Sequence, residues 1–189
     1  NFLFNGTGAT KTLDASGTGL LKFTSTFTGS GSVNNDITLT GTGSGEITGG
    51  LPFAFRNLAK TGSSAWTLGG TIGNAGTTTI TAGRLALGAD DVLSNTSAVS
   101  IAAATLDAGN FSDVLGTLDV TAAAAINLGS GASLAFADSS ASSWGSGTLK
   151  PRRVISRATW TISSRLGVIS PERPMISAPF SMAASRIFS

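Results

Sequence analysis

Residues 77–101 read TTTITAGRLALGADDVLSNTSAVSI, and this stretch decides the fold. Within it, Thr or Ser alternates with Ile, Leu or Val in short runs, and Gly or Asp separates one run from the next. Alternation with a period of two places apolar side chains on one face of a strand and hydroxyl groups on the other. Residues 60–70 (KTGSSAWTLGG) and 102–118 (AAATLDAGNFSDVLGTL) follow the same plan. The sequence therefore predicts an elongated stack of β-coils.

The strands and turns of these coils are encoded locally. Alternating apolar residues mark the inward side of the strands: Ile37 and Leu39, Ile80, Leu85 and Leu87, Val99 and Ile101. Glycine-rich stretches mark turns because glycine adopts positive φ without strain. We expect strands to start near Asp36, Ala65, Thr77, Ala98, Leu115 and Ser133. These starts bracket a coil of roughly 20 residues, which predicts an all-β single-stranded β-solenoid, with a β-sandwich as the alternative.

Composition narrows the function classes. The chain has 189 residues, of which 41% are apolar and 12% are charged, and it contains no His, Cys or Tyr. This removes the commonest general bases, thiol nucleophiles, soft metal ligands and disulfides. Small and aliphatic side chains suit the narrow core of a solenoid. We therefore predict no catalytic, cofactor-binding or metal-binding residues.

Three segments differ in composition. Residues 1–56 are richer in phenylalanine, and we expect less regular or terminal coils there, whereas residues 57–150 carry the regular repeat. Residues 151–189 hold six Lys or Arg against one Glu, and four of the five prolines. This tail is open to three interpretations: a basic arm for nucleic acid or lipid, a cap or linker, or an out-of-frame end. We favour the last, because residues 145–150 (GSGTLK) begin a coil that the tail does not continue.

No signal peptide and no run of about 18 apolar residues is present, so we expect no membrane span. Because the first residue is Asn1 and not Met, we expect the chain to be a fragment or a processed product.

Two groups of polar residues are candidates for binding sites. Asp90 and Asp91, with Asp107 or Asp113 from a neighbouring coil, have the oxygen ligands of a hard cation, but a polar turn also explains them and is the preferred interpretation. Two T-x-T runs are candidates for a flat array facing carbohydrate or ice, with plain outward decoration as the simpler explanation: Thr38, Thr40 and Thr42, then Thr77, Thr79 and Thr81.

Other residues with a chemical interpretation are few. A carbohydrate-active β-helix enzyme would need clustered acids beside a cation, and Lys60 and Arg84 are the cations of the middle region. Trp66 is expected to pack between coils, and Trp144 is the better candidate for an exposed sugar platform. Asn5, Asn95 and Asn110 open N-x-S/T triplets, which indicate surface turns.

Residues 57 to about 120 resemble the autotransporter-associated β-strand repeat of bacterial surface and secreted proteins. The resemblance rests on LAKTGSSAWTLGGTI (58–72), TTTITAGRLALGADDVLSN (77–95) and AVSIAAATLDAGNFSDVLGTL (98–118). It implies a right-handed parallel β-helix in an exported passenger region, with roles in adhesion or surface presentation. The chain shows neither the translocating barrel nor the sorting sequence that accompany such repeats, so the route of secretion stays open.

Together these observations predict a non-enzymatic, exported passenger segment that acts as a structural stalk or adhesive solenoid at the cell surface or outside the cell. Carbohydrate or the surface of a host or neighbouring cell is the expected partner, and nucleic acid is not. The alternatives are a carbohydrate-active β-helix enzyme and a threonine array that binds carbohydrate or ice.

Overall fold

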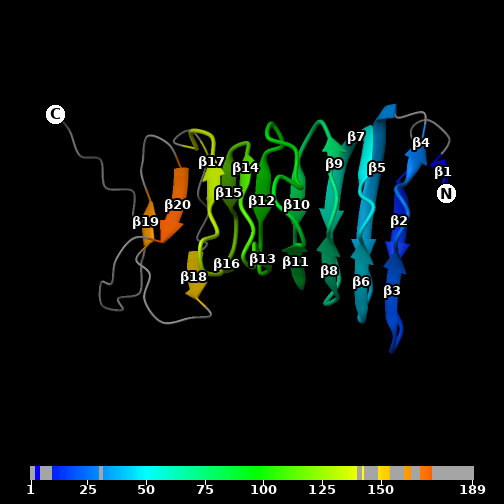
Figure 1. Cartoon of the computed structure of the whole chain (residues 1–189), viewed down its shortest axis with the longest axis horizontal. Helices are drawn as coiled ribbons and strands as arrows, with labels where there is room; N and C mark the ends of the chain where they lie inside the picture. Colours follow the sequence, from blue (N-terminus) through cyan, green and yellow to red (C-terminus); the bar gives the residue numbers. More distant parts are fainter. Residues whose placement is uncertain are drawn as a thin grey trace.

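The fold is known from a computed structural model that describes residues 3–4, 10–29, 32–139, 142, 149–153, 160–162 and 167–171. For residues 3–4, 32–33, 149–153, 160–162 and 167–171 it describes the backbone alone. The described part is all-β, without any helix, and its parallel strands stack as a β-solenoid of about five turns (Figure 1). This confirms the predicted parallel β-helix, and the β-sandwich alternative is wrong. No helix suited to crossing a membrane occurs among these residues.

The main path of the first sheet takes one strand from each coil, in chain order, and β9 (Ile72–Asn74) also joins this sheet by pairing with β7. Its strands are β2 (Lys11–Asp14), β5 (Ser32–Thr40), β7 (Leu51–Lys60), β10 (Thr78–Ile80), β12 (Val99–Ile101) and β15 (Leu118–Val120). All of these neighbours pair in parallel. Ile37 pairs with Leu58 and Val99 pairs with Leu118, so one coil returns the chain to the same position of the sheet. The first coil is longer than the others, as the pairing of Lys11 with Ile37 shows.

The second sheet follows the first after a tight corner in every coil. Its strands are β3 (Leu20–Phe23), β6 (Ser44–Ile47), β8 (Ala65–Leu68), β11 (Arg84–Leu87), β13 (Thr105–Asp107), β16 (Ala124–Leu128) and β18 (Leu149–Arg153). Several of these corners use left-handed backbone: Gly62 and Gly83 each have a φ of +68°, and Ala103 has a φ of +49°. β18 extends the sheet by one more parallel strand, so residues 149–153 continue the stack.

The third side is less regular than the two sheets. Its strands are β1 (Leu3–Phe4), β4 (Thr28–Gly29), β9 (Ile72–Asn74), β14 (Asp113–Leu115), β17 (Leu134–Phe136), β19 (Trp160–Ile162) and β20 (Gly167–Pro171). In the coil between β11 and β12 a loop replaces the strand, and Ile72 N still donates to Val92 O at 2.8 Å. β20 pairs antiparallel with β17 and with β19, which reverses the strand direction at this end.

Most predicted strand starts lie within one residue of a strand boundary, at Ala65, Thr77, Ala98 and Ser133. The prediction at Leu115 was wrong, because Leu115 ends β14 and Gly116 turns the chain before β15. The prediction at Asp36 missed the beginning of a longer strand, β5.

The core is a set of straight columns, one residue per coil, that run along the stack. One column contains Leu39, Lys60, Ile80, Ile101 and Val120, all fully buried, and Lys60 is its one charged member. The apolar residues predicted to point inward are all buried. In this narrow interior each buried residue therefore packs against the residue at the same position of the next coil, as a solenoid requires.

Trp66 has the largest fully buried side chain of the core. Its Nε1 donates to Thr40 O at 3.0 Å. The residue paired with it on the coil before is Gly45, which leaves room for the indole. The expectation that Trp66 packs between coils is confirmed.

Candidate functional site

The outward face of the first sheet is made of small polar side chains in columns. One column runs Thr12, Thr38, Ala59, Thr79, Ser100 and Asp119, one residue per coil. Of the two predicted T-x-T runs, Thr38 and Thr79 lie in this column, separated by Ala59 of the coil between them, whereas Thr42 lies beyond the end of β5. The threonines form an interrupted surface.

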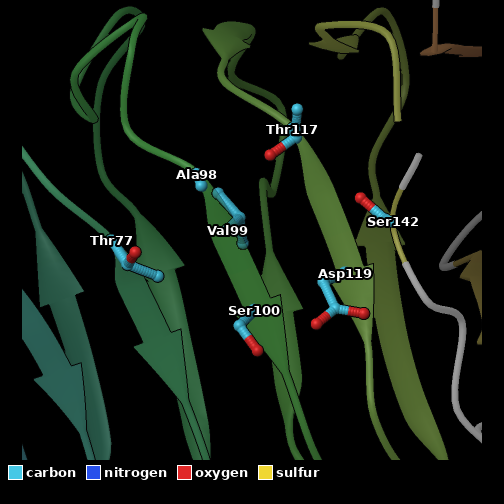
Figure 2. Close-up of a pocket in the computed structure, with 7 residues that line it drawn as sticks. All are labelled: Thr77, Ala98, Val99, Ser100, Thr117, Asp119 and Ser142. Carbon is cyan, nitrogen blue, oxygen red and sulfur yellow. The ribbon is translucent and has the colours of Figure 1, made fainter. Parts of the chain in front are cut away.

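A groove lies on this face at the end of the first sheet where β15 is the last strand (Figure 2). It is a shallow, open groove with a volume of about 380 Å³. Residues from three successive coils line it, together with one residue from the segment that follows β17: Thr77, Ala98, Val99, Ser100, Thr117, Asp119 and Ser142. Four hydroxyl groups and one carboxylate thus meet on one surface.

Asp119 is the charged group of this groove. Its Oδ1 is shielded from solvent and accepts no hydrogen bond from the described residues, and no ion pair among those residues involves its carboxylate. Its neighbour in the column is Ser100, which is paired with it in register. A carboxylate only accepts hydrogen bonds, so this oxygen is left with unused capacity.

Three other acids each form an ion pair with a cation on an adjacent coil. Asp36 accepts from Arg56 Nη2 at 2.6 Å, Glu46 from Lys22 Nζ at 2.8 Å, and Asp107 from Arg84 Nη2 at 2.7 Å. The hydrogen bond from Arg56 lowers the pKa of Asp36, and that from Lys22 lowers the pKa of Glu46. These acids therefore link coils.

Three of the four predicted cation ligands, Asp90, Asp107 and Asp113, are engaged within the protein. Asp90 Oδ1 accepts from Ser112 N at 2.7 Å and Asp113 Oδ2 from Leu93 N at 2.9 Å, while Asp107 pairs with Arg84. Asp91 has a φ of +49°, the left-handed backbone that aspartate tolerates in turns. No group of three or more potential metal ligands occurs in the described part of the chain. The preferred interpretation, a polar turn, describes this geometry.

Asp113 is the acid whose pKa is most strongly raised. Only 2% of it is exposed, and burial, with Asp91 nearby, raises its pKa to about 6. A perturbed pKa often marks a functional site, but this carboxyl group is buried and accepts from the backbone of Leu93. It cannot reach a substrate there, and its role is to hold the loop at residues 92–93.

Lys60 makes structural contacts, although from the sequence it was one of two cations that a carbohydrate-active enzyme could use. Its Nζ donates to the carbonyl oxygens of Thr61 at 2.6 Å, Gly62 at 2.9 Å and Ala82 at 3.1 Å. Desolvation lowers its pKa to about 8. The ammonium group thus closes the corner between the two sheets and joins two coils.

A buried cluster of three hydrogen-bonded polar side chains was not predicted from the sequence. Asn74, Thr78 and Ser97 are fully buried and hydrogen-bonded to one another at 2.7–3.1 Å. Asn74 and Thr78 are 4 residues apart in sequence, and Thr78 and Ser97 are 19 apart. No local sequence pattern indicates that they meet, because the register of neighbouring coils brings them together.

The remaining candidate residues divide into two sets. Asn95 and Asn110 are exposed and lie in loops, as the triplets predicted. Trp144 and Asn5 lie outside the described residues. The groove was not predicted from the sequence, because Ser100 and Asp119 become neighbours only through the pairing of one coil with the next.

Comparison with known proteins supplies no identity. No family model matches the chain, and searches of curated proteins and of solved structures find no significant match.

Proposed function

We propose that the chain is a non-enzymatic structural segment of an exported bacterial protein, which acts as a rigid stalk or adhesive surface. The observation that carries the proposal is the continuous stack: six strands of the first sheet follow one another with parallel pairing throughout, and a core column runs along them. Such a stack holds whatever it carries at a fixed distance. The repeat-like phrases of residues 57–120 support export to the cell surface.

The way the charged groups are used supports a structural role. Three acids join neighbouring coils through ion pairs, and Lys60 joins two coils through backbone carbonyls. These contacts fix the distance between coils without leaving the groups free for chemistry.

The location is tested by treating intact cells of the source bacterium with an external protease. We expect peptides from residues 57–150 to be released into the supernatant while a cytosolic marker stays intact. Release of these peptides only after lysis would contradict export.

A carbohydrate-active β-helix enzyme is the alternative that the sequence leaves open, although the acid with the raised pKa, Asp113, is buried. Incubation with acidic and neutral polysaccharides distinguishes the two. We expect no change in chain length, and a ladder of fragments would establish the enzyme instead.

A further inference from the structure

We propose that the groove at the end of the first sheet binds an amino sugar within an oligosaccharide, with the protonated amine at Asp119 and the sugar hydroxyls against Thr77, Ser100 and Thr117. The inference goes beyond the stalk role and does not depend on it. It rests on one carboxylate without a cationic partner among the described residues and on the hydroxyl groups that share its groove (Figure 2).

The carboxylate of Asp119 would be stabilised by a cationic group of a ligand. Asp36, Glu46 and Asp107 each receive a cationic side chain from an adjacent coil, whereas Asp119, like Asp14, Asp90, Asp91 and Asp113, receives none from the described residues. Of these unpaired acids, Asp119 is the one that lines the groove. Its column neighbour Ser100 carries no charge. An ammonium group would supply the missing positive charge. Because Oδ1 is shielded from solvent, the ammonium would meet the carboxylate from the side that lines the groove, and such charge-assisted bonds are the strong ones.

The hydroxyl groups specify what carries the ammonium. Thr77, Ser100 and Thr117 can each donate and accept, which matches the double capacity of sugar hydroxyls. The groove spans three coils, or about 10 Å at the spacing of neighbouring strands. That span suits two linked sugar rings, and the groove volume of about 380 Å³ accommodates them.

Two other occupants fit the groove less well. A lysine side chain would satisfy Asp119 but would leave Thr77, two coils away, without a partner. A hard metal cation prefers six or more oxygen ligands, several of them charged, and the groove offers one carboxylate. The amino sugar uses both the charge and the hydroxyls.

The described residues that line the groove include no aromatic ring, so they provide no stacking surface. We expect a dissociation constant on the order of millimolar, which nuclear magnetic resonance titration measures well.

The test titrates the ¹⁵N-labelled chain with a β-1,4-linked glucosamine disaccharide at about pH 6, where a sugar amine is protonated. We expect the largest shifts at the amides of residues 98–100 and 117–119. Asp119→Asn, which keeps the shape and removes the charge, should weaken binding about tenfold. The N-acetylated disaccharide, which has the same rings without charge, should lose affinity to a similar degree.

Asp91→Asn is the matched control. It removes one carboxylate from the third side, away from the groove, and asparagine tolerates the φ of +49° at that position. This variant should bind the disaccharide as the parent chain does. Ser100→Ala should weaken binding while leaving the unfolding temperature unchanged, so loss of binding is separated from loss of fold.

Three results would overturn the proposal. One is equal binding by the parent chain and Asp119→Asn, and another is equal weakening by Asp91→Asn. The third is equal affinity for an amidated N-acetyl-lysine, which would show that the groove selects charge alone. None of these results bears on release of the chain from intact cells, so the stalk role is judged separately.

Discussion

Exchanging Gly45 for alanine tests whether the coils are in the register described. A Cβ atom at Gly45 would clash with three carbon atoms of the Trp66 indole, two of them at 2.5 Å. The indole is fully buried and anchored by its hydrogen bond to Thr40 O, so it cannot turn aside without losing that bond.

The expected cost follows from these contacts. Overpacking costs about 1–3 kcal/mol, and a weakened hydrogen bond adds about 1 kcal/mol. The lower entropy of the unfolded chain with alanine returns about 0.4–1 kcal/mol. Gly45→Ala should therefore lower the free energy of unfolding by about 2–3 kcal/mol.

Guanidinium chloride unfolding followed by far-ultraviolet circular dichroism measures this free energy. Gly17→Ala is the control, because no atom lies within 4 Å of the Cβ position at Gly17. Trp66→Leu removes the indole, so Gly45→Ala should be almost neutral in that background, with a coupling energy of about 2 kcal/mol. Additive effects of the two substitutions would refute the proposed contact.

Further predictions concern the charged groups. The pKa of Asp113 is raised to about 6, so the folded state holds its proton more tightly and stability should fall as pH rises from about 4 to about 6; thermal melts should show this slope, and Asp113→Asn should reduce it. Lys60→Ala leaves three carbonyl groups without their donor and should cost about 2–5 kcal/mol in denaturant unfolding, whereas an effect below about 0.5 kcal/mol would contradict the contacts. Arg84→Ala removes a half-exposed partner of Asp107, so the same measurement should show at most about 1 kcal/mol.

The inward residues could be predicted from sequence because their signal is local. Leu39 and Ile80 alternate with threonines, and each side chain points to the side that its neighbours define. The inward residues of the second strand of a coil were harder to predict. For example, β6 reads SGEI and contains a single large apolar residue. Its glycine accommodates Trp66, which belongs to the next coil.

The polar groups were predictable only in part, since their partners lie one coil away. Lys60 is a cation by sequence, yet its acceptors include Ala82, 22 residues further on. Asp119 and Ser100 likewise meet through the register of β12 and β15. The lengths of the individual coils decide these contacts, and the sequence pattern bracketed those lengths without fixing them.

The direction of the strand pairing determines how the stack responds to mechanical load. The strands lie across the long axis and their backbone hydrogen bonds run along it (Figure 1). A pull on the two ends therefore loads the ladder of one coil at a time, and the terminal coil peels away first. Each coil of about 20 residues releases about 70 Å of extended chain. A segment that is stiff under bending or compression would therefore lengthen stepwise under tension. Each step would dissipate mechanical energy before the segment breaks.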